Sequence, residues 1–120
     1  MEEFRFLSWK VYQDAKGLFS SVLKFVKKLP NEYRFELGNQ VIRSSLSVVL
    51  NIAEGSGKFS DKELNRFLNI SLGSLNETLA VFDVLQHNKF ITSGEFDDTK
   101  NKIIDISRQI GGFKKKLSKL

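Results

Sequence analysis

The chain has 120 residues, which is enough for one hydrophobic core, so we expect a single domain over residues 1–120. Its hydrophobic fraction of 41% and charged fraction of 28% are typical of a soluble globular protein, and its net charge is +5. It contains no cysteine, no apolar run near the ~20 residues of a membrane span and no secretory signal pattern. Disulfides, thiolate metal sites and a cysteine nucleophile are thereby excluded, and we expect a cytoplasmic protein.

A first helix is predicted over about residues 9–29. Its apolar residues recur at alternating spacings of three and four, the pattern of a helix with one buried seam: Tyr12, Ala15, Phe19, Val22, Val26 and Leu29. A second stripe one position away (Val11, Leu18, Phe25) widens the apolar face beyond what one neighbouring helix covers. Pro30 ends the helix, because a residue that precedes proline is disfavoured in the helical conformation.

A second helix is predicted over about residues 34–54. The segment Asn51-Ile52-Ala53-Glu54-Gly55-Ser56-Gly57 closes it. Gly55 and Gly57 are expected to stop the helix, because glycine adopts the left-handed conformation without a Cβ penalty. Ser44 and Ser45 lie on its apolar face, where small side chains allow either a close helix approach or a polar cluster.

Two further helices are predicted over about residues 61–87 and 94–117. A capping-box pattern precedes each, Ser60-Asp61-Lys62-Glu63 and Thr92-Ser93-Gly94-Glu95, in which the hydroxyl and the carboxylate satisfy free backbone amides. Leucine, isoleucine and phenylalanine recur along both segments at helical spacing. The sequence shows neither the period-two pattern of strands nor an internal repeat.

Four long helices joined by short loops predict an all-α fold, an antiparallel up-down-up-down four-helix bundle. Phe4, Phe6 and Trp9 add apolar surface ahead of the first helix. Because a large exposed apolar patch marks an interface, we expect self-association through the first or the fourth helix.

Several short motifs follow one another along nearly the whole chain: Trp9-Lys10, Ala15, Leu29-Pro30, Glu32, Leu37, Gln40, Arg43, Ser47, Asn51-Ile52-Ala53-Glu54-Gly55, Phe67-Leu68 and Gly73-Ser74-Leu75-Asn76-Glu77-Thr78-Leu79. In this order and spacing the chain resembles the four-helix bundle proteins encoded within intervening sequences of bacterial 23S ribosomal RNA genes, often labelled S23 ribosomal proteins. That family is in turn similar to the accessory protein of diversity-generating retroelements, a basic pentameric barrel thought to bind nucleic acid and the reverse transcriptase. The resemblance implies a ring-like homopentamer of bundles. Where family members often have a proline before the central motif, this chain has Val48-Val49-Leu50, so its second helix is expected to be straighter.

Five polar residues of the second and third predicted helices are candidate site residues: Arg43, Asn51, Glu54, Ser74 and Glu77. Glu54 and Glu77 have the residue type of paired carboxylates for acid–base chemistry. We favour a structural interpretation, in which all five form a buried polar network that fixes the helix register. Removing Glu77 from such a network would destabilise the fold by roughly a few kcal/mol, because a buried charge would lose its partner.

The sequence predicts no catalytic residue, no metal site and no cofactor. The single histidine, His87, has no Glu-x-x-His partner of the kind that di-iron bundles use, and we expect it to be exposed. No phosphate-binding loop, dinucleotide-binding motif or esterase motif is present. Gly55-Ser56-Gly57-Lys58 is similar to a phosphate loop, but it follows a helix, and helix capping explains it more simply.

Positive charge is concentrated near the ends of the first and fourth predicted helices, at Lys24, Lys27, Lys28, Lys114, Lys115, Lys116 and Lys119. Lysines at a helix C-terminus complement the helix dipole, and a basic surface also suits contact with a polyanion. Our first hypothesis is a non-catalytic oligomer that binds nucleic acid, preferentially structured RNA, through these lysines and with low sequence specificity. The alternative is an oligomeric scaffold or adaptor for a protein partner. Neither involves a membrane.

Overall fold

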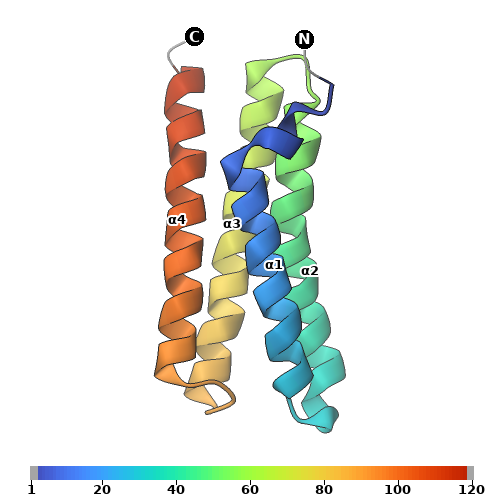
Figure 1. Ribbon diagram of the computed structural model, residues 1–120, viewed down its shortest axis with the longest axis vertical. Helices are drawn as coiled ribbons and strands as arrows, with labels where there is room; N and C mark the ends of the chain where they lie inside the picture. The colour runs from blue at the N-terminus through green and yellow to red at the C-terminus, as the bar shows by residue number, and fades with distance from the viewer. Residues whose placement is uncertain (1–2, 119–120) are drawn as a thin grey trace.

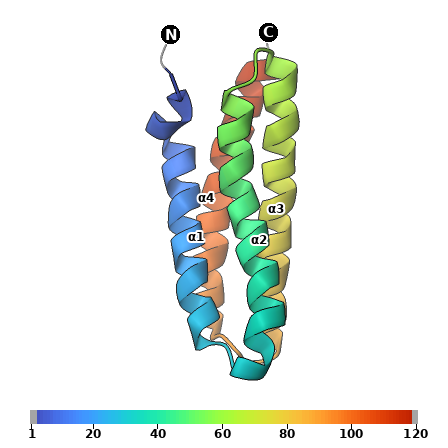
Figure 2. The ribbon, with the colours of Figure 1, turned by 90° about the vertical axis from the view of Figure 1, so that its right-hand side faces the viewer.

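The computed structural model describes residues 3–118. Within them, a short 3-10 helix η1 (Arg5–Ser8) precedes the helices α1 (Lys10–Lys28), α2 (Asn31–Ser56), α3 (Asp61–His87) and α4 (Ser93–Ser118), and there is no β-strand. The helices lie side by side along one axis of an elongated molecule measuring 47 × 22 × 20 Å (Figures 1 and 2). The predicted all-α fold with four helices is confirmed.

Contacts between distant residues show which helix ends meet. The Trp9 ring, at the start of α1, lies 4.8 Å from the Phe113 ring near the end of α4. The end of α1 meets the start of α4, where Lys28 Nζ lies 3.4 Å from Glu95 Oε2. Arg5 donates to the carbonyl of Ser56, so η1 is attached to the end of α2. The α1 and α4 C-termini therefore lie at opposite ends of the molecule (Figure 1).

The core consists of two apolar clusters along the bundle axis. The larger one gathers residues from all four helices around Leu18, Ile52, Leu68, and Ile106, and the smaller one surrounds Phe82. The fully buried residues of α1 are Val11, Ala15, Leu18 and Val22. Tyr12, Phe19 and Val26 are only partly buried, because the centre of the inward face lies between the two predicted stripes.

The two ends of α2 differ from the prediction. The helix begins at Asn31 instead of about residue 34, because the carbonyl of Pro30 accepts the amides of Tyr33 and Arg34 and starts the first turn. It continues to Ser56, so that Gly55 lies inside the helix and does not end it. The predicted left-handed glycine closure is wrong. No glycine among residues 3–118 has a positive φ, and Gly57, which follows the helix, has φ −89°.

The two predicted capping boxes have different outcomes. At α4, the Thr92 amide donates to Glu95 Oε1 at 2.9 Å and the Glu95 amide donates to Thr92 Oγ1 at 3.0 Å, as predicted. At α3, Ser60 Oγ accepts the Glu63 amide at 3.1 Å, but the Glu63 carboxylate pairs with Arg66 at 3.0 Å. Only half of the box at α3 forms, because the guanidinium one turn along the helix competes for the carboxylate.

Candidate nucleic-acid interface

The lysines predicted to contact nucleic acid occupy both ends of the bundle. Lys24, Lys27 and Lys28 lie at the end of α1, and Lys114, Lys115 and Lys116 lie at the end of α4, at the opposite end (Figure 1). Lys119 lies outside the described residues. The structure does not bring the two groups together, so they do not form one continuous contact surface on a single chain.

The end that contains the first group is electrically balanced. Its residues, 22–37 and 82–100, include six basic and six acidic side chains. Lys28 already pairs with Glu95 at 3.4 Å, and its ammonium group lies 5.3 Å from the centre of the Phe25 ring. We call this part of the molecule the balanced end. Its acidic residues reduce the attraction that Lys24, Lys27 and Lys28 can exert on a polyanion.

The opposite end has a basic excess. Its described residues, 3–9, 53–66 and 111–118, include four acidic side chains and seven basic ones: Arg5, Lys58, Lys62, Arg66, Lys114, Lys115 and Lys116. We call this part of the molecule the basic end. Three segments that are far apart in the sequence meet there, namely η1, the connection between α2 and α3, and the last turns of α4 (Figure 1).

Several of these basic groups are held by neighbours. Lys114 donates to Asn65 Oδ1 at 3.1 Å and also to Asn69, and this fastens the end of α4 to α3. Lys58 and Arg66 both lie over the Phe67 ring, with their charged groups 5.1 Å and 4.5 Å from its centre, in cation–π geometry. The exposed Lys58 thus keeps its outward side available to a phosphate, whereas Arg66 also pairs with Glu63 at 3.0 Å.

Sequence reasoning missed the contribution of Arg5, Lys58, Lys62 and Arg66 to this surface. None of them belongs to a dense run of basic residues, and they come from separate segments. The available signal was the capping turn at Ser60. It fixes the place where α2 passes to α3 and so places Lys58 and Lys62 next to one bundle end.

The predicted buried polar network is wrong in three of its five members. The side chains of Arg43, Glu54 and Glu77 are exposed in the single chain, and Glu77 accepts one hydrogen bond, from Gln40 at 2.9 Å. They lie on the outer side of α2 and α3, whereas the inward positions are taken by apolar residues and by serine and threonine. The close carboxylate pair considered for acid–base chemistry does not form either. Glu77 of α3 contacts Gln40, which lies 14 residues before Glu54 on α2, so the two carboxylates are far apart along the helix.

Asn51 and Ser74 do join a polar cluster between α2 and α3, through a residue that the sequence analysis did not select. Ser74 Oγ donates to Ser47 Oγ at 2.8 Å, and Asn51 Nδ2 donates to the same oxygen at 3.0 Å. Deeper in the same interface, Ser44 Oγ and Thr78 Oγ1 are 2.8 Å apart and both residues are buried. The central polar cluster is therefore made of hydroxyl and amide groups, which need no charged partner.

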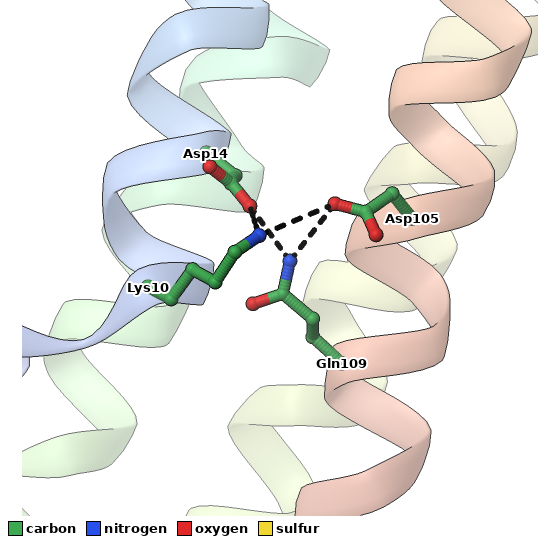
Figure 3. Close-up of polar contacts among 4 residues, drawn as sticks. All are labelled: Lys10, Asp14, Asp105 and Gln109. Carbon is green, nitrogen blue, oxygen red and sulfur yellow. Dashed lines mark hydrogen bonds and ion pairs between the residues drawn. The ribbon is translucent and has the colours of Figure 1, made fainter.

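A second polar cluster joins α1 to α4 (Figure 3). Asp14 Oδ2 accepts from Lys10 Nζ at 2.6 Å and from Gln109 Nε2 at 2.7 Å, and Gln109 also donates to Asp105 Oδ2 at 3.0 Å. The hydrogen bonds from Lys10 and Gln109 hold the pKa of Asp14 below its ordinary value. Asp14 is therefore ionised at neutral pH, and this cluster acts as a bridge between the two helices.

The described residues contain no group of three or more histidine, cysteine, aspartate or glutamate side chains placed to hold a metal ion. His87, the last residue of α3, is exposed, as the sequence predicted. None of the described helices has the length and apolar character that a transmembrane segment needs. That the chain is not an enzyme stays a prediction.

Comparisons with known proteins place the chain in a family. The model of the 23S rRNA-intervening sequence protein family matches residues 8–112. The chain belongs to this family. A solved structure from the S23 ribosomal protein family, a protein of unknown function from Bacteroides thetaiotaomicron, superposes with a TM-score of 0.77 and 26% sequence identity, over 83% of this chain and 94% of that one. No curated protein matches.

These findings confirm the family resemblance that the motifs predicted. The motif residues Gly55 and Ser74 both lie between α2 and α3, where Gly55 packs against Phe67 and Ser74 bonds to Ser47. These two motif residues therefore contribute to the interface that holds the two middle helices together. The relation to the retroelement accessory protein stays a prediction.

Proposed function

We propose that this 23S rRNA-intervening sequence protein is a non-catalytic, self-associating up-down-up-down bundle that binds nucleic acid, preferentially structured RNA, through its basic end. The observation that carries the proposal is the difference in charge between the two ends. Seven basic side chains face four acidic ones at the basic end, whereas the numbers are equal at the balanced end, counted over residues 3–118. An uneven charge distribution of this kind steers a polyanion to one part of a surface.

The lysines of the basic end suit contacts with backbone phosphates better than they suit sequence-specific contacts with base edges. Lys62 and Lys116 are exposed on α3 and α4, and the exposed Lys58 lies on the loop between α2 and α3. Such cations neutralise phosphates of the nucleic-acid backbone, and the affinity they give falls with increasing salt concentration. The lysines predicted at the end of α1 keep a secondary role, because Lys28 is paired with Glu95 and acidic residues surround the group.

Self-association is supported by the outer face of α2 and α3, which we call the α2–α3 outer face and define by Arg43, Leu50, Ile70, Gly73 and Glu77. Leu50 is 54% exposed and Ile70 is 39% exposed. A Cβ placed on Gly73 would meet nothing within 4 Å, so the backbone is open to a close approach from outside. The sequence favoured the first or fourth helix for this contact. Among the described residues of these two helices, however, Leu23 is the only large apolar side chain that is exposed.

Charge complementarity points to a second copy of this chain as the partner of that face. Arg43 forms no ion pair with any residue in 3–118, and Glu77 has only the amide of Gln40 as a neighbouring donor. Arg43 on α2 of one copy can pair with Glu77 on α3 of the next copy, and a contact between two different helices can repeat head to tail around a ring. The homopentamer implied by the family resemblance is one such ring. Several basic ends would then act together on one nucleic acid.

The experiment is a binding titration of the purified protein with a structured RNA hairpin over a series of salt concentrations. The proposal predicts binding at low salt whose affinity decreases steeply as salt rises. No binding at low salt, or an affinity independent of salt, would exclude it in favour of the scaffold alternative. Light scattering under the same conditions tests the second part, which predicts a native mass several times that of one chain.

A further inference from the structure

A hollow of about 590 Å³ opens at the basic end between the N-terminal segment and the connection from α2 to α3. Its lining includes three aromatic side chains, Phe4, Phe6 and Phe59, together with Arg5 and Lys58. We call it the aromatic hollow. Phe59 is completely exposed, with a relative exposure of 109%, and Phe4 is 69% exposed. The core of the chain gains nothing from two phenylalanine rings in this position.

The walls of the aromatic hollow are fixed to the bundle. Arg5 Nε donates to the carbonyl of Ser56 at 2.9 Å, and its guanidinium lies 5.2 Å from the centre of the Trp9 ring. The Phe6 ring packs edge-on against Tyr12 with centroids 4.8 Å apart. On the other side, Ser60 caps α3 immediately after Phe59. Phe4 therefore stands next to the anchored residues Arg5 and Phe6, and Phe59 stands next to the α3 cap.

We propose that the aromatic hollow receives an unpaired nucleobase of the nucleic acid bound at the basic end. This inference rests on the proposed function and adds the kind of nucleic acid that the site selects. An exposed aromatic ring next to cations is the arrangement with which proteins stack unpaired bases, and every base offers a face for such stacking. A base in a duplex is stacked between its neighbours and does not reach the ring.

The charges around the hollow agree with a base inside it and phosphates outside it. The carboxylates of Glu3, Glu54 and Asp61 also line the hollow. They repel phosphate, and they accept hydrogen bonds from the amino and imino groups that a base carries on its edge. The backbone of the nucleic acid is then held by Lys58, which lines the hollow, and by the exposed Lys62, which directly follows the lining residue Asp61. Single-stranded loops and ends are the parts of an RNA that can place a base inside the hollow while their phosphates stay outside it.

The test compares two probes, a blunt-ended RNA duplex and the same duplex with a single-stranded extension. The wild-type protein is expected to bind the extended probe at least about 5-fold more tightly, which is the smaller effect of one base–aromatic stack. Phe59→Ala should remove about 5- to 100-fold of the affinity for the extended probe and leave the blunt duplex unchanged. Phe59→Tyr should restore the preference, whereas Phe59→Leu should not, because leucine is apolar but has no ring face.

Phe35→Ala is the matched control. Phe35 is 73% exposed and lies in the second turn of α2, at the balanced end. It should bind both probes as the wild type does. Equal binding of the two probes by the wild type, or an unchanged preference in Phe59→Ala, would overturn the inference while leaving the proposed function standing. A wild-type protein that binds neither probe would overturn both. A loss of self-association in Phe59→Ala without a change in probe preference would assign the ring to a contact between copies and would also overturn it.

Discussion

Gly55 of α2 packs directly against Phe67 of α3. A Cβ built on Gly55 would lie 2.9 Å from the Cβ of Phe67 and 3.1 Å from a methyl group of Leu64, both of which are tighter than ordinary contacts. The glycine of the Asn-Ile-Ala-Glu-Gly motif therefore serves a close approach between two helices, and not the end of a helix. The same approach brings Phe67 under the cations of Lys58 and Arg66 and so shapes the basic end.

Gly55→Ala is expected to destabilise the fold by about 1–3 kcal/mol, because a methyl group overpacks the contact with Phe67. Gly17→Ala is the control. Gly17 is exposed within α1, and a Cβ added to it would meet nothing within 4 Å, so alanine there should stabilise the helix by up to about 1 kcal/mol. Urea unfolding followed by circular dichroism gives both values. A neutral Gly55→Ala would show that α2 and α3 can move apart at no cost.

Truncating two adjacent residues of α3 should change the unfolding free energy by very different amounts. Thr78→Ala is expected to cost roughly 1–3 kcal/mol, because Thr78 is buried and its hydroxyl bonds to Ser44. Glu77→Ala should change the unfolding free energy by no more than about 0.5 kcal/mol at concentrations where the chain is monomeric, because Glu77 is exposed. Chemical denaturation at low protein concentration measures both. A large loss in Glu77→Ala would restore the buried network that the sequence predicted.

Stability is expected to fall as the pH drops below the ordinary pKa values of carboxyl groups, about 4. The hydrogen bond from Lys10 lowers the pKa of Asp14, and the backbone amide of Thr92 lowers that of Glu95. A depressed folded-state pKa contributes stability above the unfolded-state pKa, and this is lost as the pH falls through the folded-state value. Asp14→Asn together with Glu95→Gln should flatten the acid limb of the unfolding free energy against pH. An unchanged limb would contradict these assignments.

The sequence was sufficient for the four helices and for most of their boundaries, because the apolar spacing in each is regular and the caps at Ser60 and Thr92 are explicit. It was insufficient for the position of Glu77 and Arg43. Periodicity shows that a residue is off the apolar face, but not whether it turns toward the neighbouring helix or to solvent. It also did not locate the basic end, because Arg5, Lys58 and Lys116 belong to three separate segments that only the folded structure places at one end of the bundle.

Changes on the α2–α3 outer face should alter the oligomeric state and not the fold. Arg43→Glu reverses a charge on an exposed position without an ion pair in the described chain, so it should dissociate the assembly while the monomer keeps its unfolding free energy. Gly73→Leu should do the same by filling the open backbone surface. Sedimentation velocity measures both. Lys16→Glu, on the exposed side of α1, is the control and should leave the mass unchanged. If the native mass is unchanged in both variants, the contact between copies does not lie on the α2–α3 outer face.

The proposed function requires that one end of the bundle, and not the other, holds nucleic acid. Two triple variants remove the same charge from the two ends: Lys58→Gln, Lys62→Gln and Lys116→Gln at the basic end, and Lys24→Gln, Lys27→Gln and Lys28→Gln at the balanced end. The most direct measurement is their affinity for one RNA hairpin as a function of salt concentration. The account predicts that the basic-end variant binds at least about 10-fold more weakly, with a slope of log affinity against log salt reduced by up to about 2–3, and that the balanced-end variant binds nearly as the wild type does. Equal losses in the two variants, or a loss confined to the balanced end, would contradict it.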